Sequence, residues 1–226
     1  MLPITDESRR PSHFPVVTVS IIVLNALGFL CELIWGDAFV ERWSLIPAQV
    51  VAGKHLITIL TSMFMHGSWL HIIGNMVFLW AFGPGVEDSM NPVRFAVFYL
   101  LGGIVAMSAQ VAVDPSSTIP TLGASGAIAA VMGAFMVTYP RDKIRTVFLL
   151  GWIVDVTFVP AALLIGLWFL IQLFNVGVVA NAQTGGVAYV AHIAGILFGA
   201  ATARLFEDRH RLIGTRRKLD QPYDSS

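Results

Sequence analysis

Long apolar runs separated by short polar segments cover most of this chain. A helix that crosses the hydrocarbon of a bilayer needs about 20 apolar residues. We predict membrane-spanning helices over the runs that approach this length, which are residues 14–35, 57–82, 95–113, 125–138, 159–178 and 187–206. Pro160 divides a longer apolar run that begins at Val147, because proline disrupts a helix interior. We therefore expect residues 147–158 to lie at the membrane interface, and the pattern predicts an all-α bundle of six transmembrane helices.

The composition supports a membrane protein. Of the 226 residues, 56% are hydrophobic and only 12% are charged, whereas about 25% of the residues in an ordinary soluble domain are charged. So little polar surface would not keep a soluble fold dispersed. The formal net charge of zero argues against nucleic acid as a partner. The first apolar run is long and no small-residue cleavage site follows it, so we expect no secretory signal peptide.

The lysines and arginines indicate how the helices are oriented. Six crossings place both ends of the chain on one side, and only Arg42 and Lys54 then lie on the other side. Positive charge concentrates on the cytoplasmic side of a membrane protein. We therefore expect a multi-pass protein of the cell membrane with both termini in the cytoplasm. Its parts would be an N-terminal segment 1–13, a membrane domain 14–206 and a C-terminal tail 207–226.

Two longer loops are expected on the outer face. Residues 36–56 contain Trp43 and Pro47, which suggest a folded loop at the interface. Residues 175–187 carry no charge and are rich in glycine and asparagine. This second loop is either a flexible gate or a plain connection.

Four polar side chains lie inside the predicted helices, where polar groups are costly and mark functional sites by default. They are His71, Asn75, Ser125 and His192. His71 and Asn75 are four residues apart and therefore share a helix face. With a rise of about 1.5 Å per residue, all four fall in the outer half of the bilayer. We expect them to share one layer, where a nucleophile, a base and hydrogen-bond donors could meet.

Small residues indicate how the helices that carry Ser125 and His192 pack. They recur every four positions, as Gly195 and Gly199 on one helix and as Ser125, Ala129 and Gly133 on the other. Surfaces of this kind let helix backbones approach closely. If the two faces meet, His192 reaches the Ser125 hydroxyl. A neutral imidazole there is the general base that a serine nucleophile needs.

Each of these residues also has a simpler interpretation. A serine at a helix start often caps the helix, and histidine or asparagine inside a membrane commonly ties helices together. We interpret His66 in this structural way, as a link between the outer loop and the second helix. A metal site on His66, His71 and His192 would lack a cysteine or carboxylate at ligand spacing. We therefore expect no metal and no cofactor.

Short motifs surround these residues along nearly the whole chain. In chain order they are "RWSLIPA", "HGSWLHIIGN", "FGPGVED", "GASG", "GLWFLIQLF" and "AHIAGILFG". Together, and in this order over residues 14–206, they resemble the rhomboid intramembrane serine proteases. A lone "GASG" would be far less specific.

The resemblance implies a role for each matching residue. Ser125 would be the nucleophile and His192 its general base. His71 and Asn75 would join the Ser125 backbone N–H in an oxyanion hole. Glu87, at the inner end of the second helix, matches a position that is structural in the family. No carboxylate takes a third catalytic role, so we expect packing to orient His192.

One position departs from the family pattern. Relatives often carry an aromatic residue four positions after the serine, beneath the histidine ring, but this chain has Ala129 there. We expect another side chain to brace the imidazole, with Tyr189 as the candidate. The departure bears on the efficiency of the Ser125–His192 pair.

The resulting prediction is an intramembrane serine endopeptidase that acts on transmembrane proteins in the lipid bilayer. Its substrates would expose an extended, helix-breaking stretch near the outer surface. The alternative is a rhomboid-like protein that binds membrane clients without cutting them, although such relatives typically lose the serine or the histidine. A transporter is disfavoured, because the chain shows neither an internal repeat nor a carboxylate near the midplane of a predicted helix.

Overall fold

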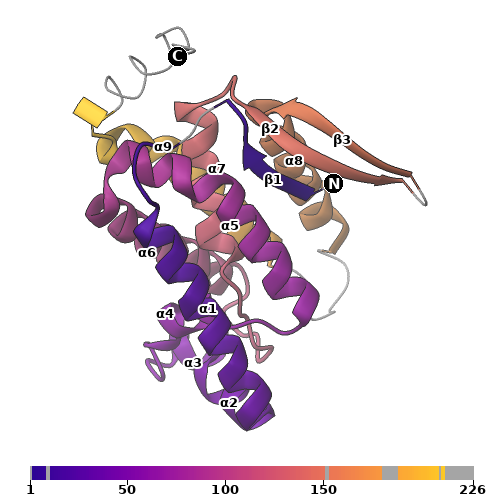
Figure 1. Ribbon diagram of the computed structural model, residues 1–226. Helices are drawn as coiled ribbons and strands as arrows, with labels where there is room; N and C mark the ends of the chain where they lie inside the picture. The colour runs from indigo at the N-terminus through magenta and orange to yellow at the C-terminus, as the bar shows by residue number, and fades with distance from the viewer. Residues whose placement is uncertain (1, 9–10, 151–152, 180–187, 209, 212–226) are drawn as a thin grey trace, which may run out of the picture.

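The computed structural model describes residues 2–8, 11–150, 153–179, 188–208 and 210–211 (Figure 1). The long helices are α1 (Val16–Trp35), α5 (Trp69–Met90), α6 (Pro92–Val113), α7 (Ser125–Thr138), α8 (Ala161–Val179) and α9 (Tyr189–Phe206). Short helices follow α1, namely α2 (Asp37–Trp43), α3 (Pro47–Val51), α4 (Thr58–Thr61) and a 3-10 turn, η1 (Ser62–Phe64). Three strands complete the fold, β1 (Leu2–Asp6), β2 (Lys143–Leu150) and β3 (Ile153–Pro160).

Helix α7 lies at the centre of the helical bundle. It contacts α5, α6, α8 and α9, and every residue from Gly126 to Phe135 is buried. Between Gly126 and Phe135 its sequence contains only glycine, alanine and larger apolar residues, so no polar side chain lies in this part of the core. The bundle around α7 is what holds residue Ser125, at the helix start, in place.

The helix lengths agree with a membrane protein. Helices α1, α5, α6 and α9 are long and apolar enough to cross a membrane, and α7 and α8 provide shorter apolar stretches. On α1 the side chains of Leu24, Leu27 and Leu30 are each about half exposed, as expected of side chains that face lipid. The number of crossings stays a prediction, because length and composition support only four of the six.

The second predicted helix starts later than expected. Residues 58–64 form the separate short elements α4 and η1, and α5 begins only at Trp69. Ser68 caps α5, because its Oγ accepts a hydrogen bond from the backbone N–H of His71 at 3.2 Å. The prediction of one helix over residues 57–82 rested on hydrophobicity alone. The hydrogen bond at Ser68 starts a new helix within that range. The predicted loop 36–56 is folded, as α2 and α3.

The fold is mostly helical, as predicted, but a small three-stranded sheet that the prediction did not include adds to the helices. Strands β2 and β3 form an antiparallel hairpin in the register Lys143↔Pro160 to Leu150↔Ile153, and β1 adds to β2 as a third, antiparallel strand. Residues 147–150 and 153–158 of the expected interfacial segment therefore belong to strands rich in β-branched side chains, which favour this structure. In Figure 1 the sheet lies beside α8, at the opposite end of the molecule from α2 and α3.

Glu87 near the end of α5 holds the start of α1. Its Oε1 accepts the backbone N–H of Val17 at 2.9 Å, and its Oε2 accepts the backbone N–H of Thr18 at 2.8 Å and the Thr18 hydroxyl at 2.7 Å. A carboxylate at a helix N-terminus satisfies N–H groups that have no partner within the helix. The structural role predicted for Glu87 is confirmed.

The predicted contact between the small faces of α7 and α9 is also confirmed. A Cβ atom at Gly199 would overlap the carbonyl oxygen of Ala130, and one at Gly195 would overlap the carbonyl oxygen of Gly126. From the other side, a Cβ atom at Gly133 would overlap the carbonyl oxygen of Ile196. The two backbones therefore touch over about two turns, which only glycine permits.

This contact predicts a stability difference between two glycine substitutions. Gly199→Ala should destabilise the protein by about 1–3 kcal/mol through overpacking, which corresponds to a loss of roughly 2–4 °C per kcal/mol in the unfolding midpoint. Gly166→Ala is the matched control, because nothing lies within 4 Å of the Cβ it would add on α8. Thermal unfolding in detergent measures both. Equal midpoints for the two variants would contradict the close contact.

Candidate active site

Ser125 is the first residue of α7, and the segment before it is tightly held. The backbone N–H of Gly123 donates to the carbonyl oxygen of Ser62 at 2.9 Å. Gly123 has a φ of 131°, a conformation that favours glycine. The turn leaves the Ser125 side chain half-buried and its backbone N–H among the first N–H groups of α7, which have no partner within the helix.

His192 contacts the serine directly. Its Nε2 lies 2.7 Å from Ser125 Oγ, and the histidine is only 5% exposed. The two residues are 67 positions apart and meet because α9 packs against α7 through the glycine contact. The expected meeting of these two side chains is thus present.

Gln172 on α8 determines which nitrogen of His192 carries the proton. The Oε1 atom of this buried glutamine lies 2.9 Å from His192 Nδ1. An amide oxygen only accepts, so Nδ1 carries the proton and Nε2 is left to accept the hydroxyl proton of Ser125. The expectation that packing orients His192 in place of a buried acid left out this hydrogen bond to a neutral glutamine. Sequence reasoning missed Gln172, although it is a polar outlier in the quoted motif "GLWFLIQLF".

Aromatic rings flank the imidazole on two sides. The ring centroid of Trp168, one turn before Gln172, lies 5.2 Å from that of His192 at an interplanar angle of 41°. Tyr189, the predicted brace, lies farther away, at 6.5 Å and 85°. Ala129 packs against α9 instead, since its Cβ would lie 3.0 Å from a Cβ placed on Gly195. A small residue at position 129 therefore allows the close approach of α9, and Trp168 supplies the aromatic contact.

His71 lies next to the serine. A Cβ atom placed on Gly123 would lie 2.9 Å from His71 Nε2 and 3.6 Å from Ser125 Oγ, so both side chains border the same small space. Asn75 is one turn farther along α5, and its Nδ2 lies 2.9 Å from His66 Nε2. The link between His66 and the second helix, predicted from the sequence, is this hydrogen bond.

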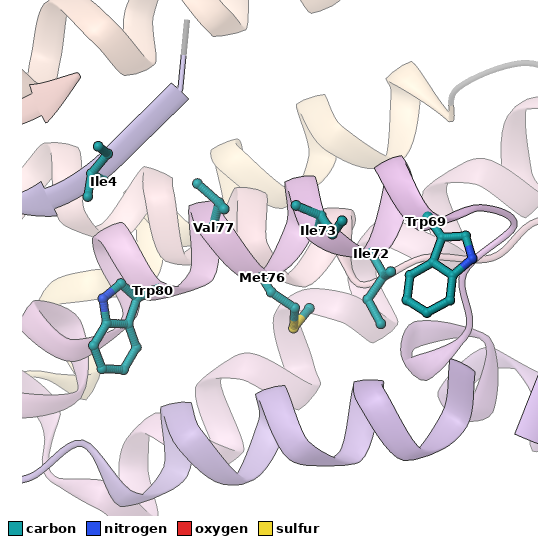
Figure 2. A pocket seen from close by; sticks show the side chains of 7 residues that line it. All are labelled: Ile4, Trp69, Ile72, Ile73, Met76, Val77 and Trp80. Atoms are coloured by element: carbon teal, nitrogen blue, oxygen red, sulfur yellow. The ribbon is translucent and has the colours of Figure 1, made fainter. Parts of the chain in front are cut away.

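The surface of α5 carries an apolar groove apart from the candidate site. An apolar groove of about 450 Å³ runs along α5 and is lined by Ile4, Trp69, Ile72, Ile73, Met76, Val77 and Trp80 (Figure 2). None of the four predicted site residues lines it, and on a membrane-spanning helix such a surface suits lipid. Within the part of the chain that the structure describes, no three His, Cys, Asp or Glu side chains gather to hold a metal ion.

The residues of this site lie within a region that matches a known protein family. The family model of the rhomboid domain matches residues 53–209, which include all four predicted site residues. The chain belongs to the rhomboid family. The resemblance that the motifs carry is thereby confirmed at the level of the family.

Several rhomboid relatives are similar in sequence and bear mitochondrial names. "RHOMBOID-like protein 12, mitochondrial" of Arabidopsis thaliana is 27% identical over 77% of this chain and 56% of its own length. "Rhomboid protein 1, mitochondrial" of Saccharomyces cerevisiae is 28% identical over 71% of this chain and 44% of its own length. "Presenilin-associated rhomboid-like protein, mitochondrial" of Mus musculus is 30% identical over 57% of this chain and 34% of its own length. The chain thus spans between a third and just over half of these relatives.

The hydrogen bond from His192 to Gln172 predicts the behaviour of two substitutions. In an assay of the peptidase function proposed below, Gln172→Leu should lower kcat/KM by about 10-fold or more, because an imidazole without its partner takes the wrong tautomer or orientation. Gln172→Glu keeps an acceptor and should retain more activity than Gln172→Leu. Initial rates of substrate cleavage in detergent measure both.

The matched control is Gln110→Leu, which removes a half-buried amide from α6. It should leave kcat/KM within about 2-fold, since it removes no contact to the site, while any loss of folding is followed by thermal unfolding. Equal losses of kcat/KM in Gln110→Leu and Gln172→Leu would contradict the role of Gln172.

Proposed function

We propose that this rhomboid-family protein is an intramembrane serine endopeptidase. The observation that carries the proposal is the 2.7 Å contact between Ser125 Oγ and His192 Nε2, with Gln172 on the second ring nitrogen. A nucleophile, a base and a group that orients the base are the parts that acyl transfer by serine requires. A histidine that only tied helices together would not need its free lone pair aimed at a serine hydroxyl.

The proposed reaction proceeds through an acyl-enzyme. His192 Nε2 takes the proton of Ser125 as Oγ attacks the carbonyl carbon of the peptide bond. The same nitrogen then gives that proton to the departing amine. Water, activated by His192, hydrolyses the ester and restores Ser125. In each step the proton is transferred by His192 Nε2. Nδ1 keeps its own proton throughout, which agrees with its hydrogen bond to Gln172 Oε1.

The negative charge that develops on the carbonyl oxygen needs donors. The backbone N–H of Ser125 is available at the start of α7, where the helix dipole favours an anion. His71 borders the same space, and Asn75 lies one turn along α5. We assign these three groups to the oxyanion hole. Each such donor contributes about 10²–10³-fold in kcat in other serine proteases.

The proposed substrates are transmembrane proteins with an extended, helix-breaking stretch near the outer surface. An extended peptide is required, because the carbonyl of a helical residue is occupied by its own hydrogen bond. We propose the membrane domain 14–206 with six crossings and cytoplasmic termini in the cell membrane, on the basis of the charge distribution of this chain. Residues 180–187 of the candidate gate and 212–226 of the tail lie outside the described residues.

The first test compares the wild-type protein with Ser125→Ala and His192→Ala. Purified protein in liposomes should cleave a fluorogenic transmembrane substrate, and each variant should lose about 10⁴-fold or more of that rate, since the pair acts as a unit. Ser116→Ala and His55→Ala change exposed side chains of the same types and should cleave like the wild type. Absence of cleavage by folded wild-type protein on several substrates would favour the client-binding alternative.

Cleavage should also depend on pH in one direction. His192 acts as a base only while its ring is neutral, so kcat/KM should fall as the pH is lowered and the ring takes up a proton. The profile is measured between pH 4 and pH 8 on the liposome substrate, with a folding control at each pH. A flat profile down to pH 4 would remove His192 from the role of base.

A further inference from the structure

A buried carboxylate stands outside the machinery described so far. Glu32 lies near the end of α1 and is only 6% exposed. Ionisable groups within membrane-spanning helices are costly and are rarely found without a function. None of the groups assigned to the reaction lies on α1, so the role of Glu32 must be sought in what it contacts.

Glu32 contacts the segment that precedes α5. Its Oε1 accepts the backbone N–H of His66 at 2.8 Å. His66 lies between η1 and α5, is 1% exposed, and its ring centroid lies 5.0 Å from that of His71 in an edge-on arrangement. The carboxylate therefore fixes the backbone of a residue that borders one of the proposed oxyanion donors.

The ring of His66 continues the chain of contacts to Asn75. His66 Nε2 lies 2.9 Å from Asn75 Nδ2. An amide nitrogen only donates, so Nε2 accepts and the ring is neutral. Burial, together with nearby His71, lowers the pKa of His66 to about 3, which keeps the ring in this neutral form over the ordinary range of pH.

This contact decides which end of the Asn75 amide is available to a substrate. One N–H of Nδ2 is bound to His66, which leaves the second N–H to donate elsewhere. If the acceptor on His66 moved away, the amide could turn over and exchange Nδ2 for Oδ1. An amide oxygen facing the developing oxyanion would repel it, whereas the amide nitrogen stabilises it.

We infer that Glu32 is a positioning residue, which acts through His66 to hold the Asn75 amide with its nitrogen toward the oxyanion. The inference rests on the proposed function. The length of the Glu32 side chain places its acceptor oxygen at the backbone N–H of His66. The contacts Glu32–His66 and His66–Asn75 together connect α1 to the proposed reaction centre.

Two conservative variants distinguish the length of the Glu32 side chain from its negative charge. Glu32→Gln keeps an oxygen at the same distance and should retain kcat within about 3-fold, because a neutral acceptor serves a backbone N–H nearly as well. Glu32→Asp keeps the charge but withdraws the acceptor by one methylene. It should lower kcat by about 10-fold or more while KM stays within about 2-fold, as expected for a donor that acts mainly in the transition state.

The matched control is Asn25→Ala. Asn25 is a fully buried amide on the same helix as Glu32, and its Nδ2 donates to the carbonyl oxygen of Ile21 within α1. Asn25→Ala should lower the unfolding midpoint without changing kcat. An equal loss of kcat in Asn25→Ala and Glu32→Asp would show a general loss of packing and overturn the inference, as would full activity of Glu32→Asp.

A second readout does not depend on cleavage. In protein labelled with ¹⁵N-asparagine, the side-chain NH₂ signals of Asn75 are assigned by their loss in Asn75→Ala. They should be unchanged in Glu32→Gln and shifted or doubled in Glu32→Asp, because the amide loses its fixed orientation. Unchanged signals in Glu32→Asp would overturn the inference. If wild-type protein failed to cleave while these signals shifted as expected, the proposed function would fail and the positioning contact would stand.

Discussion

The close contact between the backbones of α7 and α9 is the constraint on which the rest of the structure depends. Three glycines place carbonyl oxygens of one helix where the Cβ atoms of the other would be. This close contact sets the distance between the axes of α7 and α9 and the register in which the two helices pack. The hydroxyl of Ser125 and the Nε2 atom of His192 reach 2.7 Å only because that position is fixed. A contact made only of backbone and small side chains is rigid, since it has no rotamers to change.

A polar group in a low-dielectric interior is costly unless it is paired, and three buried polar side chains of this protein are paired with neighbouring elements. Glu87 joins the end of α5 to the start of α1. Glu32 joins the other end of α1 to the segment before α5. Gln172 joins α8 to α9. Because an unpaired polar group there would be costly, each pair also specifies which helices are neighbours and in which register they pack.

The sequence predicted the helices better than the connections between them. Helices around Ser125 and His192 were located to within two residues, because their apolar runs are bounded by clear polar segments. The start of α5 was missed, because Ser68 ends the apolar run only through a hydrogen bond to a backbone N–H. The strands β2 and β3 were missed because their apolar residues were interpreted as an interfacial segment. The third strand was missed because β1 pairs with β2 from more than a hundred residues away, and a distant partner leaves no local pattern.

The candidate site shows the same division. Ser125, His192, His71 and Asn75 could be named because polar side chains in apolar helices are conspicuous. Gln172 is equally conspicuous, but its role depends on the distance between two helices, which no spacing along the chain gives. Trp168 could not be chosen over Tyr189 for a related reason. Both are aromatic, and only the packed geometry shows which ring lies nearer to the imidazole.

The attachment of α8 has a consequence for how the candidate site holds together. Trp168 and Gln172 reach His192 from α8, so the serine and histidine remain together on α7 and α9 even if α8 tilts away. Such a tilt would separate only Trp168 and Gln172 from His192, and with Gln172 the contact that places the proton on Nδ1. The start of α8 follows β3 directly, and the sheet ends on β1, which packs against α5. The amino-terminal strand is thus connected through β2 and β3 to the start of the helix that carries Gln172.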